Sequence, residues 1–161
     1  MPEGTSAFDA RLPLGQWVHA AAARHGAKPA LHAADGSYDY VAFARRIDAL
    51  AGSLAATGVG RGGVAAWLGT NSAAMVATLV AATRLGAVFL PLNWRLAPPE
   101  HRAQLAAVAP RVLVADGEFA DASASQQVAP AGTLCIARDA APPAGWIGWE
   151  DFTARSAPAA A

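Results

Sequence analysis

The sequence contains a single cysteine, Cys135, among its 161 residues. One cysteine forms no internal disulfide and no cysteine cluster for a metal, which is typical of proteins of a reducing cytosol. Charge is also scarce, because charged residues make up only 15% of the chain and the formal net charge is +0. Such a chain has no broad electrostatic surface for nucleic acid or for an anionic membrane. We therefore expect a cytoplasmic protein that binds neither.

Long hydrophobic runs are rare, and only residues 73–92 approach the length of a membrane span. A spanning helix there would bury Arg84, and a charge at mid-bilayer costs about 2.5–3.5 kcal/mol on insertion scales. Gly86 and Pro91 are better explained by a helix that ends near Leu85 and a strand that follows it. Residues 1–4 also lack a basic segment followed by an apolar run. We predict no membrane span and no secretory signal.

Hydrophobic residues make up 54% of the chain, and their spacing predicts alternating helices and strands. Gly26 and Gly58 are suitable stops for two of the helices, and Asp35-Gly36 is a strong hairpin-turn dipeptide between two short strands. Asn71 or Ser72 can cap a third helix. The expected helices cover residues 14–25, 43–57, 72–85 and 99–109, and the expected strands cover 29–34, 37–40, 64–68, 88–92 and 112–115, with a further candidate at 134–137.

Three of these strands read "VAAWL", "VFLPL" and "VLVA". Continuous apolar runs are typical of parallel strands that are buried on both faces. We therefore predict an α/β fold, a layered and mostly parallel sheet with flanking helices joined by right-handed crossovers. The helix over residues 72–85 is apolar nearly all round, so more than the sheet should cover it. We expect an α/β subdomain over 1–116 and a looser continuation over 117–161, with polar or proline-rich connections at 117–133 and 142–143.

Two glycine-containing segments are candidates for ligand binding. Residues 58–63, "GVGRGG", match the dinucleotide pattern GxGxxG, but they follow a helix and precede a strand, the reverse of the order that binds a pyrophosphate. A helix stop and loop explain them better. Residues 69–72, "GTNS", leave the carboxyl end of a strand, where open α/β sheets bind ligands. Asn71 and Ser72 are also ordinary helix caps, so both interpretations stay open.

Asn93, Trp94 and Arg95 follow the carboxyl end of the next strand. Their polar groups could face a ligand, or they could satisfy the backbone at a turn while Trp94 packs. We expect the ligand-facing edge of the sheet to contain Gly69, Asn71, Ser72, Asn93 and Arg95.

The sequence shows no catalytic constellation. The four histidines have no metal-ligand spacing, and no GxSxG elbow, Walker-type loop or nucleophile with an evident base is present. We therefore predict no catalytic residue and no metal site within the chain.

Two segments carry a resemblance to a known family. The segment "SYDYVAF" is similar to an early "(T/S)Y-x-E-L" motif of AMP-forming acyl-CoA synthetases, members of the adenylate-forming superfamily, although Tyr40 and Val41 depart from it. The segment "TRLGAVFLPLNWRL" resembles the family's second motif, "LKAGAVYVPLNPRL", with Trp94 at the position where proline is common. The similarity runs from about Leu14 to Asp116, so the chain resembles the N-terminal part of such an enzyme.

The resemblance implies an ATP-dependent ligase that converts a fatty or related carboxylic acid into an acyl-adenylate and then into an acyl-CoA. The complete family uses ATP, magnesium and CoA. Its phosphate loop, ending in Pro-Lys-Gly, should begin shortly after Phe152, and its catalytic lysine lies in a later domain. Lys28 lies too early in the chain to replace that lysine. The resemblance therefore implies that the chain alone holds no cofactor and does not adenylate an acid.

Other interpretations remain open. The chain could be a non-catalytic binding or scaffold module that pairs with a separately encoded remainder, or, with less support, a nucleotide-binding oxidoreductase domain. An apolar surface left by missing subdomains would favour self-association.

Overall fold

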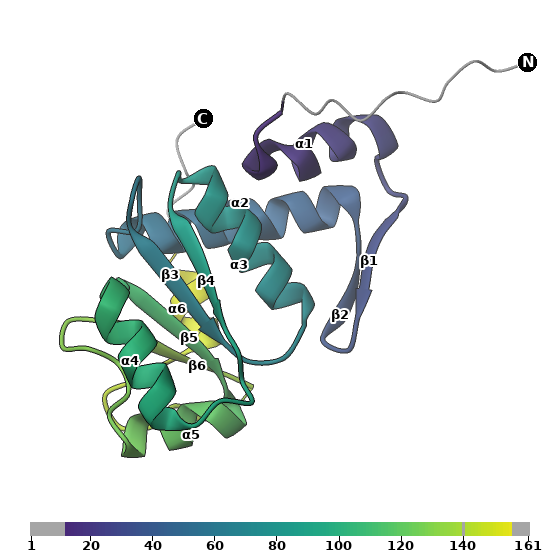
Figure 1. The fold of residues 1–161 in the computed structure, drawn as a ribbon. Helices are drawn as coiled ribbons and strands as arrows, with labels where there is room; N and C mark the ends of the chain where they lie inside the picture. Colours follow the sequence, from purple (N-terminus) through teal and green to yellow (C-terminus); the bar gives the residue numbers. More distant parts are fainter. Residues whose placement is uncertain (1–11, 140, 156–161) are drawn as a thin grey trace, which may run out of the picture.

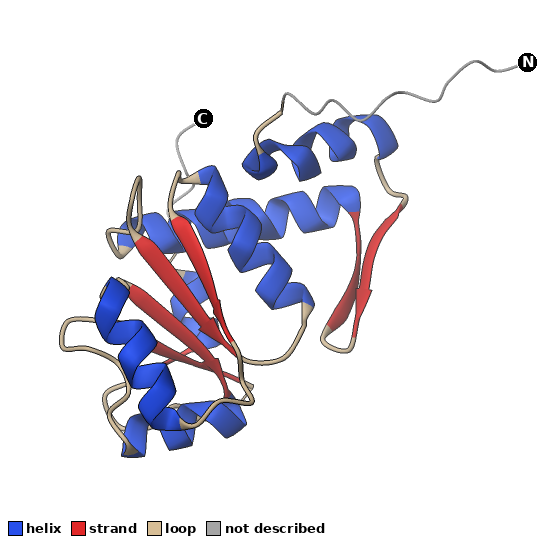
Figure 2. Cartoon of the chain, in the orientation of Figure 1, coloured by secondary structure: helices blue, strands red, loops and turns tan. Residues whose placement is uncertain are grey.

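The computed structural model describes residues 12–139 and 141–155, so residues 1–4 lie outside the described part. A parallel sheet with helices on both faces forms its centre and confirms the predicted α/β class (Figure 1, Figure 2). The sheet contains β3 (Val64–Leu68), β4 (Val88–Leu92), β5 (Val112–Asp116), β6 (Leu134–Arg138) and β7 (Ile147–Gly148). The helices are α1 (Leu14–His25), α2 (Tyr40–Ala56), α3 (Ala73–Arg84), α4 (Pro98–Val108), α5 (Gly117–Ser125) and α6 (Trp149–Ala154).

The strands of the sheet lie in the order β4-β3-β5-β6-β7. Every neighbouring pair is parallel, with Val64 opposite Val88 and Ala65 opposite Val112. The three strands predicted to lie side by side and run the same way therefore do so. Because the chain steps from β3 to β4 and then returns past β3 to β5, crossovers of one hand place α3 and α4 on opposite faces (Figure 1).

The two faces of the sheet have separate apolar cores. On one face, side chains of α2, α3 and α6 pack against β3, β5 and β6, with Ile47, Trp67 and Phe152 fully buried. On the other face, α4 and α5 pack against the alternate residues of the same strands, around Leu105 and Leu113. The alternation explains why each strand reads as a continuous apolar run.

Strand β4 departs from this rule because it is the edge of the sheet. Val88 is 52% exposed, so the expectation that this strand is buried on both faces is wrong. The N–H of Val88 donates to the carbonyl of Gly63 at 2.8 Å, so the backbone N–H and C=O groups of residues 88, 90 and 92 point towards β3. The backbone groups of residues 89 and 91 point to the open side of this edge strand. Pro91 has no N–H to lose on that side, which makes proline acceptable in this edge strand and blocks regular pairing with a further strand.

Helix α3 is covered by more than the sheet, as predicted. It packs against α1 and α2 as well, and most of its residues are buried. Ser72, one of the two predicted caps, forms the N-cap, because its Oγ accepts the N–H of Met75 at 3.1 Å. Little apolar surface of α3 is therefore left for self-association.

Strands β1 (Pro29–Ala33) and β2 (Gly36–Asp39) form a separate antiparallel hairpin. Gly36 pairs with Ala33, so Ala34 and Asp35 are the loop residues and the predicted turn is displaced by one residue. The displacement leaves the Asp35 side chain free to point away from the hairpin.

The region from 117 to 133 is more regular than we expected, since α5 occupies its first half. The candidate strand at 134–137 is present as β6, and β6 pairs with β5 in the same sheet. The expected boundary after residue 116 therefore falls between β5 and β6, two neighbouring strands of the same sheet. No helix in the described part of the chain is long and apolar enough to cross a membrane.

Candidate functional site

The carboxyl ends of β3 and β5 meet at the point where the direction of the strand order reverses. In open α/β sheets, the crevice at such a point is the usual place for a ligand. Gly69 follows β3 and Asp116 ends β5, and the two lie against each other. A Cβ atom at position 69 would lie 2.4 Å from Asp116 Oδ2, so glycine is required for this close approach. The Asp116 carboxylate therefore occupies the crevice itself.

The Asp116 carboxylate is held by the guanidinium of Arg138 and by a backbone N–H group. Its Oδ2 accepts the N–H of Thr70 at 2.9 Å, and its Oδ1 accepts Nε of Arg138 at 2.8 Å. The side chains of Asp116 and Arg138 are only 10% and 7% exposed. The guanidinium also stacks over the Trp67 ring, at 5.7 Å from its centroid. The buried guanidinium of Arg138, at the end of β6, therefore links the carboxyl ends of β3 and β5 to that of β6.

Asp35 joins this network from the β1–β2 hairpin. Its Oδ1 accepts the N–H of Ala73 at 2.7 Å, and its Oδ2 accepts the N–H of Ala74 at 3.1 Å. Arg138 Nη1 lies 3.3 Å from the same Oδ2. Burial would raise the pKa of the Asp35 carboxyl, but the two backbone hydrogen bonds and the charge of Arg138 outweigh it and hold the pKa below its ordinary value of 3.8.

A hollow of about 470 Å³ opens beside this network. Its walls carry the carboxylates of Asp116, Glu118, Asp121 and Asp139, and its guanidinium, Arg138, is already paired. Because carboxylates repel phosphates, the lining of this hollow does not suit the phosphates of ATP.

The predicted ligand-facing edge consists of residues that follow two neighbouring strands. Gly69, Asn71 and Ser72 follow β3, and Asn93 and Arg95 follow β4. The sheet therefore brings the two groups to the same edge. Gly69 allows the close approach of the Asp116 carboxylate, and Ser72 caps α3. The Asn71 side chain is exposed.

The segment after β4 forms a turn. Asn93 Oδ1 accepts the N–H of Arg95 at 3.1 Å, and the Asn93 carbonyl oxygen lies 2.9 Å from Nε2 of the buried His101. The Trp94 ring lies 6.1 Å from the ring of Phe119, and the Arg95 guanidinium stacks on Trp94 at 4.3 Å. Among the described residues, no carboxylate pairs with Arg95. Asn93 and Trp94 thus shape the turn, and Arg95 keeps its donors available.

Sequence reasoning missed Asp35, Asp116 and Arg138. Asp116 and Arg138 are the last residues of their strands, a position that places them at the carboxyl edge of the sheet. No local sequence pattern, however, indicates that their side chains form an ion pair. Asp35 was assigned only to a turn.

Other sequence candidates have structural roles. The glycine loop at 58–63 lies between α2 and β3, at the end of the sheet opposite the crevice, which confirms its interpretation as a helix stop and loop. Cys135 is buried, and burial raises the pKa of its thiol to about 11, so it is neutral and unreactive near neutral pH.

The comparison with protein families decides the assignment. Residues 18–160 match the model of the family described as AMP-binding enzyme. The chain belongs to this family.

Several curated relatives of this chain are named as CoA ligases. It is 40% identical over 145 residues to an indoleacetate–CoA ligase of Aromatoleum aromaticum, a match that covers 90% of this chain and 28% of the relative. It is 38% identical over 142 residues to a feruloyl-CoA synthase of an Amycolatopsis species, covering 80% of this chain and 27% of the relative. The chain thus spans little more than a quarter of the length of these relatives and resembles their N-terminal part.

Solved structures show the same fold. The anthranilate CoA ligase AuaEII in complex with anthranoyl-AMP superposes with a TM-score of 0.85 at 20% identity, over 92% of this chain and 29% of that one. A benzoate CoA ligase from Burkholderia xenovorans gives 0.79 at 21% identity, over 92% and 29%. The α/β architecture of this chain is therefore that of the N-terminal domain of adenylate-forming CoA ligases.

Proposed function

We propose that this chain is the N-terminal part of an ATP-dependent ligase that joins an aromatic carboxylic acid to CoA. The observation that carries the proposal is its 40% identity, over 90% of its length, to an indoleacetate–CoA ligase. Other relatives are named for ferulate and 3-hydroxybenzoate, which favours an aromatic acid over the fatty acid first expected.

The proposed reaction has two steps. A carboxylate oxygen attacks the α-phosphorus of ATP, forming the acyl-adenylate and releasing pyrophosphate. The thiolate sulfur of CoA then attacks the acyl carbon, and AMP leaves. Both steps need cations and oriented donors around the phosphates, and the described residues that line the hollow beside the crevice are mostly carboxylates.

The contribution of this chain is one wall of the site. The strand ends hold Gly69, Asn71, Ser72, Asn93 and Arg95 at one edge of the sheet. Of these, Arg95 has a guanidinium that is preorganised by stacking on Trp94 and is not paired with a carboxylate in the described part of the chain. We propose that this edge faces the substrates in the complete enzyme.

The purified chain should show no exchange of pyrophosphate with ATP in the presence of magnesium and indoleacetate, ferulate or 3-hydroxybenzoate. The physical reason is the carboxylate-lined hollow beside the crevice, which repels a triphosphate. A complete indoleacetate–CoA ligase assayed in parallel provides the positive control. Exchange by the chain above the level of a protein-free blank would contradict this part of the proposal.

A further inference from the structure

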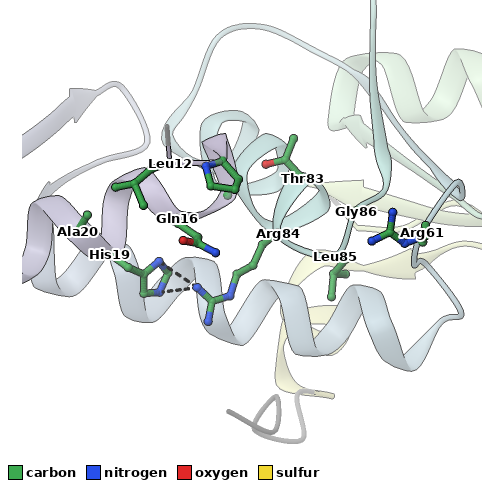
Figure 3. Close-up of a pocket in the computed structure, with 11 residues that line it drawn as sticks. Leu12, Gln16, His19, Ala20, Arg61, Thr83, Arg84, Leu85 and Gly86 are labelled. Atoms are coloured by element: carbon green, nitrogen blue, oxygen red, sulfur yellow. Dashed lines mark hydrogen bonds between the residues drawn. The ribbon is translucent and has the colours of Figure 1, made fainter. Parts of the chain in front are cut away.

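A hollow of about 770 Å³ lies between α1, the loop before β3 and the end of α3 (Figure 3). The Arg84 guanidinium is turned towards His19 there. The Oδ1 atom of Asp48 lies 2.8 Å from His19 Nε2 and 3.4 Å from Arg84 Nη2. Because these three side chains come from α1, α2 and α3, the cluster joins α1 to its two neighbouring helices. Unpaired backbone groups lie instead at the edges of the two sheets.

Four strand edges in the described part of the chain pair with no further strand: the outer sides of β4 and β7 in the parallel sheet, and both sides of the β1–β2 hairpin. Natural sheets usually protect such edges with proline, a bulge, a charged side chain or a very short strand. Pro91 protects β4, β7 has only two residues, and Pro29 and a bulge at Ala30 protect β1. The one charged residue of β2, Asp39, is engaged by the N–H of Ala42 at 2.6 Å as the cap of α2. Strand β2 therefore has none of these protections.

The backbone groups of β2 point alternately towards β1 and away from it. The N–H of Tyr40, directly after β2, donates to the carbonyl of Lys28 at 3.2 Å and so points towards β1. Because backbone groups of successive residues in a strand point to opposite sides, those of Tyr38 also point towards β1, and those of Ser37 and Asp39 point to the open side. No turn or loop hydrogen bond of the described residues reaches the N–H or the carbonyl of Ser37. Strand β2 thus presents free donors and acceptors at an unprotected edge.

The two faces of the hairpin differ from this edge. On one face, Leu31 and Tyr38 pack against the core beside α2. On the other face, His32 Nδ1 lies 2.8 Å from Ser37 Oγ, and both residues are exposed. None of the residues of β1 or β2 is buried, whereas β5 is buried throughout. A two-stranded sheet is marginally stable in water without further strands or a helix, so a third strand at the β2 edge would add to the support that α2 provides.

A large part of the ligase lies outside this chain. The matched segment covers 28% of the indoleacetate–CoA ligase, so nearly three quarters of that polypeptide is available to supply a strand. A segment of the same polypeptide has a high effective concentration near the hairpin, which favours it over a separate partner. We propose that a strand from the part of the ligase polypeptide beyond this chain pairs with the open edge of β2. The proposal rests on the proposed function, because only a longer ligase contains such a segment.

The hairpin also indicates the side chains of this strand. Residues that lie beside each other on neighbouring strands share a face of the sheet. The residue beside Tyr38 should be apolar, because it would cover the exposed part of the half-buried Tyr38 ring. The residue beside Ser37 should be polar, because this face of the hairpin is exposed. The partner is therefore an amphipathic strand in which apolar and polar residues alternate.

The test compares amide hydrogen exchange in the isolated chain with exchange in a chimera, read residue by residue by mass spectrometry with electron-transfer fragmentation. In the chimera, the chain replaces the corresponding N-terminal segment of the Aromatoleum aromaticum indoleacetate–CoA ligase. In the isolated chain, the Ser37 N–H should exchange like an unpaired amide, whereas the Tyr38 N–H should be protected by β1. In the chimera, the N–H groups of Ser37 and Asp39 should exchange at least about tenfold more slowly than in the isolated chain, because each gains a hydrogen bond.

His32 provides the internal control. It lies opposite Ser37 in the hairpin, so its backbone groups point outward on the β1 side. Its N–H should change by less than about twofold between the isolated chain and the chimera. No slowing at Ser37, or equal slowing at His32, would overturn the proposal. Protection of Ser37 that equals that of Tyr38 in the isolated chain would overturn it as well, and this measurement needs no chimera.

Two proline variants of the chimera form a matched pair. Ser37→Pro and His32→Pro each remove one outward N–H, and both break the side-chain contact between His32 and Ser37. With Ser37→Pro, the Asp39 N–H should exchange as fast as in the isolated chain, because the added strand is lost. With His32→Pro, it should stay slow. The same exchange at Asp39 in both variants would contradict pairing at the β2 edge.

Thioester formation by the same chimera separates this proposal from the proposed function. A chimera that forms the thioester while its Ser37 N–H exchanges as fast as in the isolated chain would overturn the strand pairing and leave the ligase function in place. Slow exchange at Ser37 in a chimera that forms no thioester would support the strand pairing and contradict the ligase function alone.

Discussion

Replacing Arg138 by methionine should lower the free energy of unfolding by about 3–5 kcal/mol, the range for breaking a buried ion pair by removing one partner. Arg138 lies within 2.8–3.3 Å of the carboxylates of Asp116, Asp139 and Asp35. Methionine keeps much of the aliphatic stem over Trp67 but removes the charge. The buried carboxylate of Asp116 would then keep only its contacts with Thr70. Urea denaturation followed by far-ultraviolet circular dichroism measures the loss.

Two further variants separate this effect from a general loss of charge. Asp139→Asn removes a carboxylate that also contacts Arg138, but its side chain is 61% exposed, so the cost should be below about 1 kcal/mol. The double variant Arg138→Met/Asp116→Asn should recover part of the stability, because it removes the charge of Asp116 that Arg138→Met leaves buried and unpaired. A loss from Arg138→Met no larger than that from Asp139→Asn would contradict the buried network.

The second large effect concerns Asp35. Asp35→Asn should cost about 2 kcal/mol near neutral pH, because an amide oxygen replaces a carboxylate that holds two N–H groups of α3 and one guanidinium. This carboxylate connects the β1–β2 hairpin to the start of α3. The variant should therefore also loosen the hairpin, seen as faster hydrogen exchange at Leu31 and Tyr38.

The contribution of Asp35 should also depend on pH. Since its folded pKa lies below the ordinary value of 3.8, the stabilisation is complete above that value and is lost as the pH falls through the folded pKa. The variant should therefore lose less stability than the parent chain as the pH is lowered below 3.8. Asp121→Asn, at an exposed position of α5, provides the control and should keep the parent's acid dependence. Parallel acid profiles for parent and Asp35→Asn would argue against this role.

The sheet could be predicted from sequence because its strands are short apolar runs between helices with evident ends. Gly58 after α2, Ser72 before α3 and Pro98 at the start of α4 are local signals, and local signals fix where elements begin and end. The exposure of Val88 was missed because an edge strand and a central strand can share the same composition. Strand order, which determines the edge, depends on the crossovers and not on the strand itself.

The site was predicted only in part for the same reason. Glycine and asparagine after strands marked the carboxyl edge of the sheet, and the assignment of this edge to a ligand stays a prediction. However, Asp35 and Arg138 are 103 residues apart, and their contact depends on the packing of the hairpin against α3. A pairing between residues so distant in sequence carries no local pattern, so Asp116 was not recognised as the group that fills the crevice.

The most direct test of the account is a chimera. The chain would replace the corresponding N-terminal segment of the Aromatoleum aromaticum indoleacetate–CoA ligase, with which it shares 40% identity. We predict that the folded chimera forms the CoA thioester of an aromatic acid when given ATP, magnesium and CoA, and that Arg95→Ala lowers its turnover. A chimera that folds like the parent ligase and yet forms no thioester from any of its aromatic acids would contradict the central claim that this chain is the N-terminal part of such a ligase.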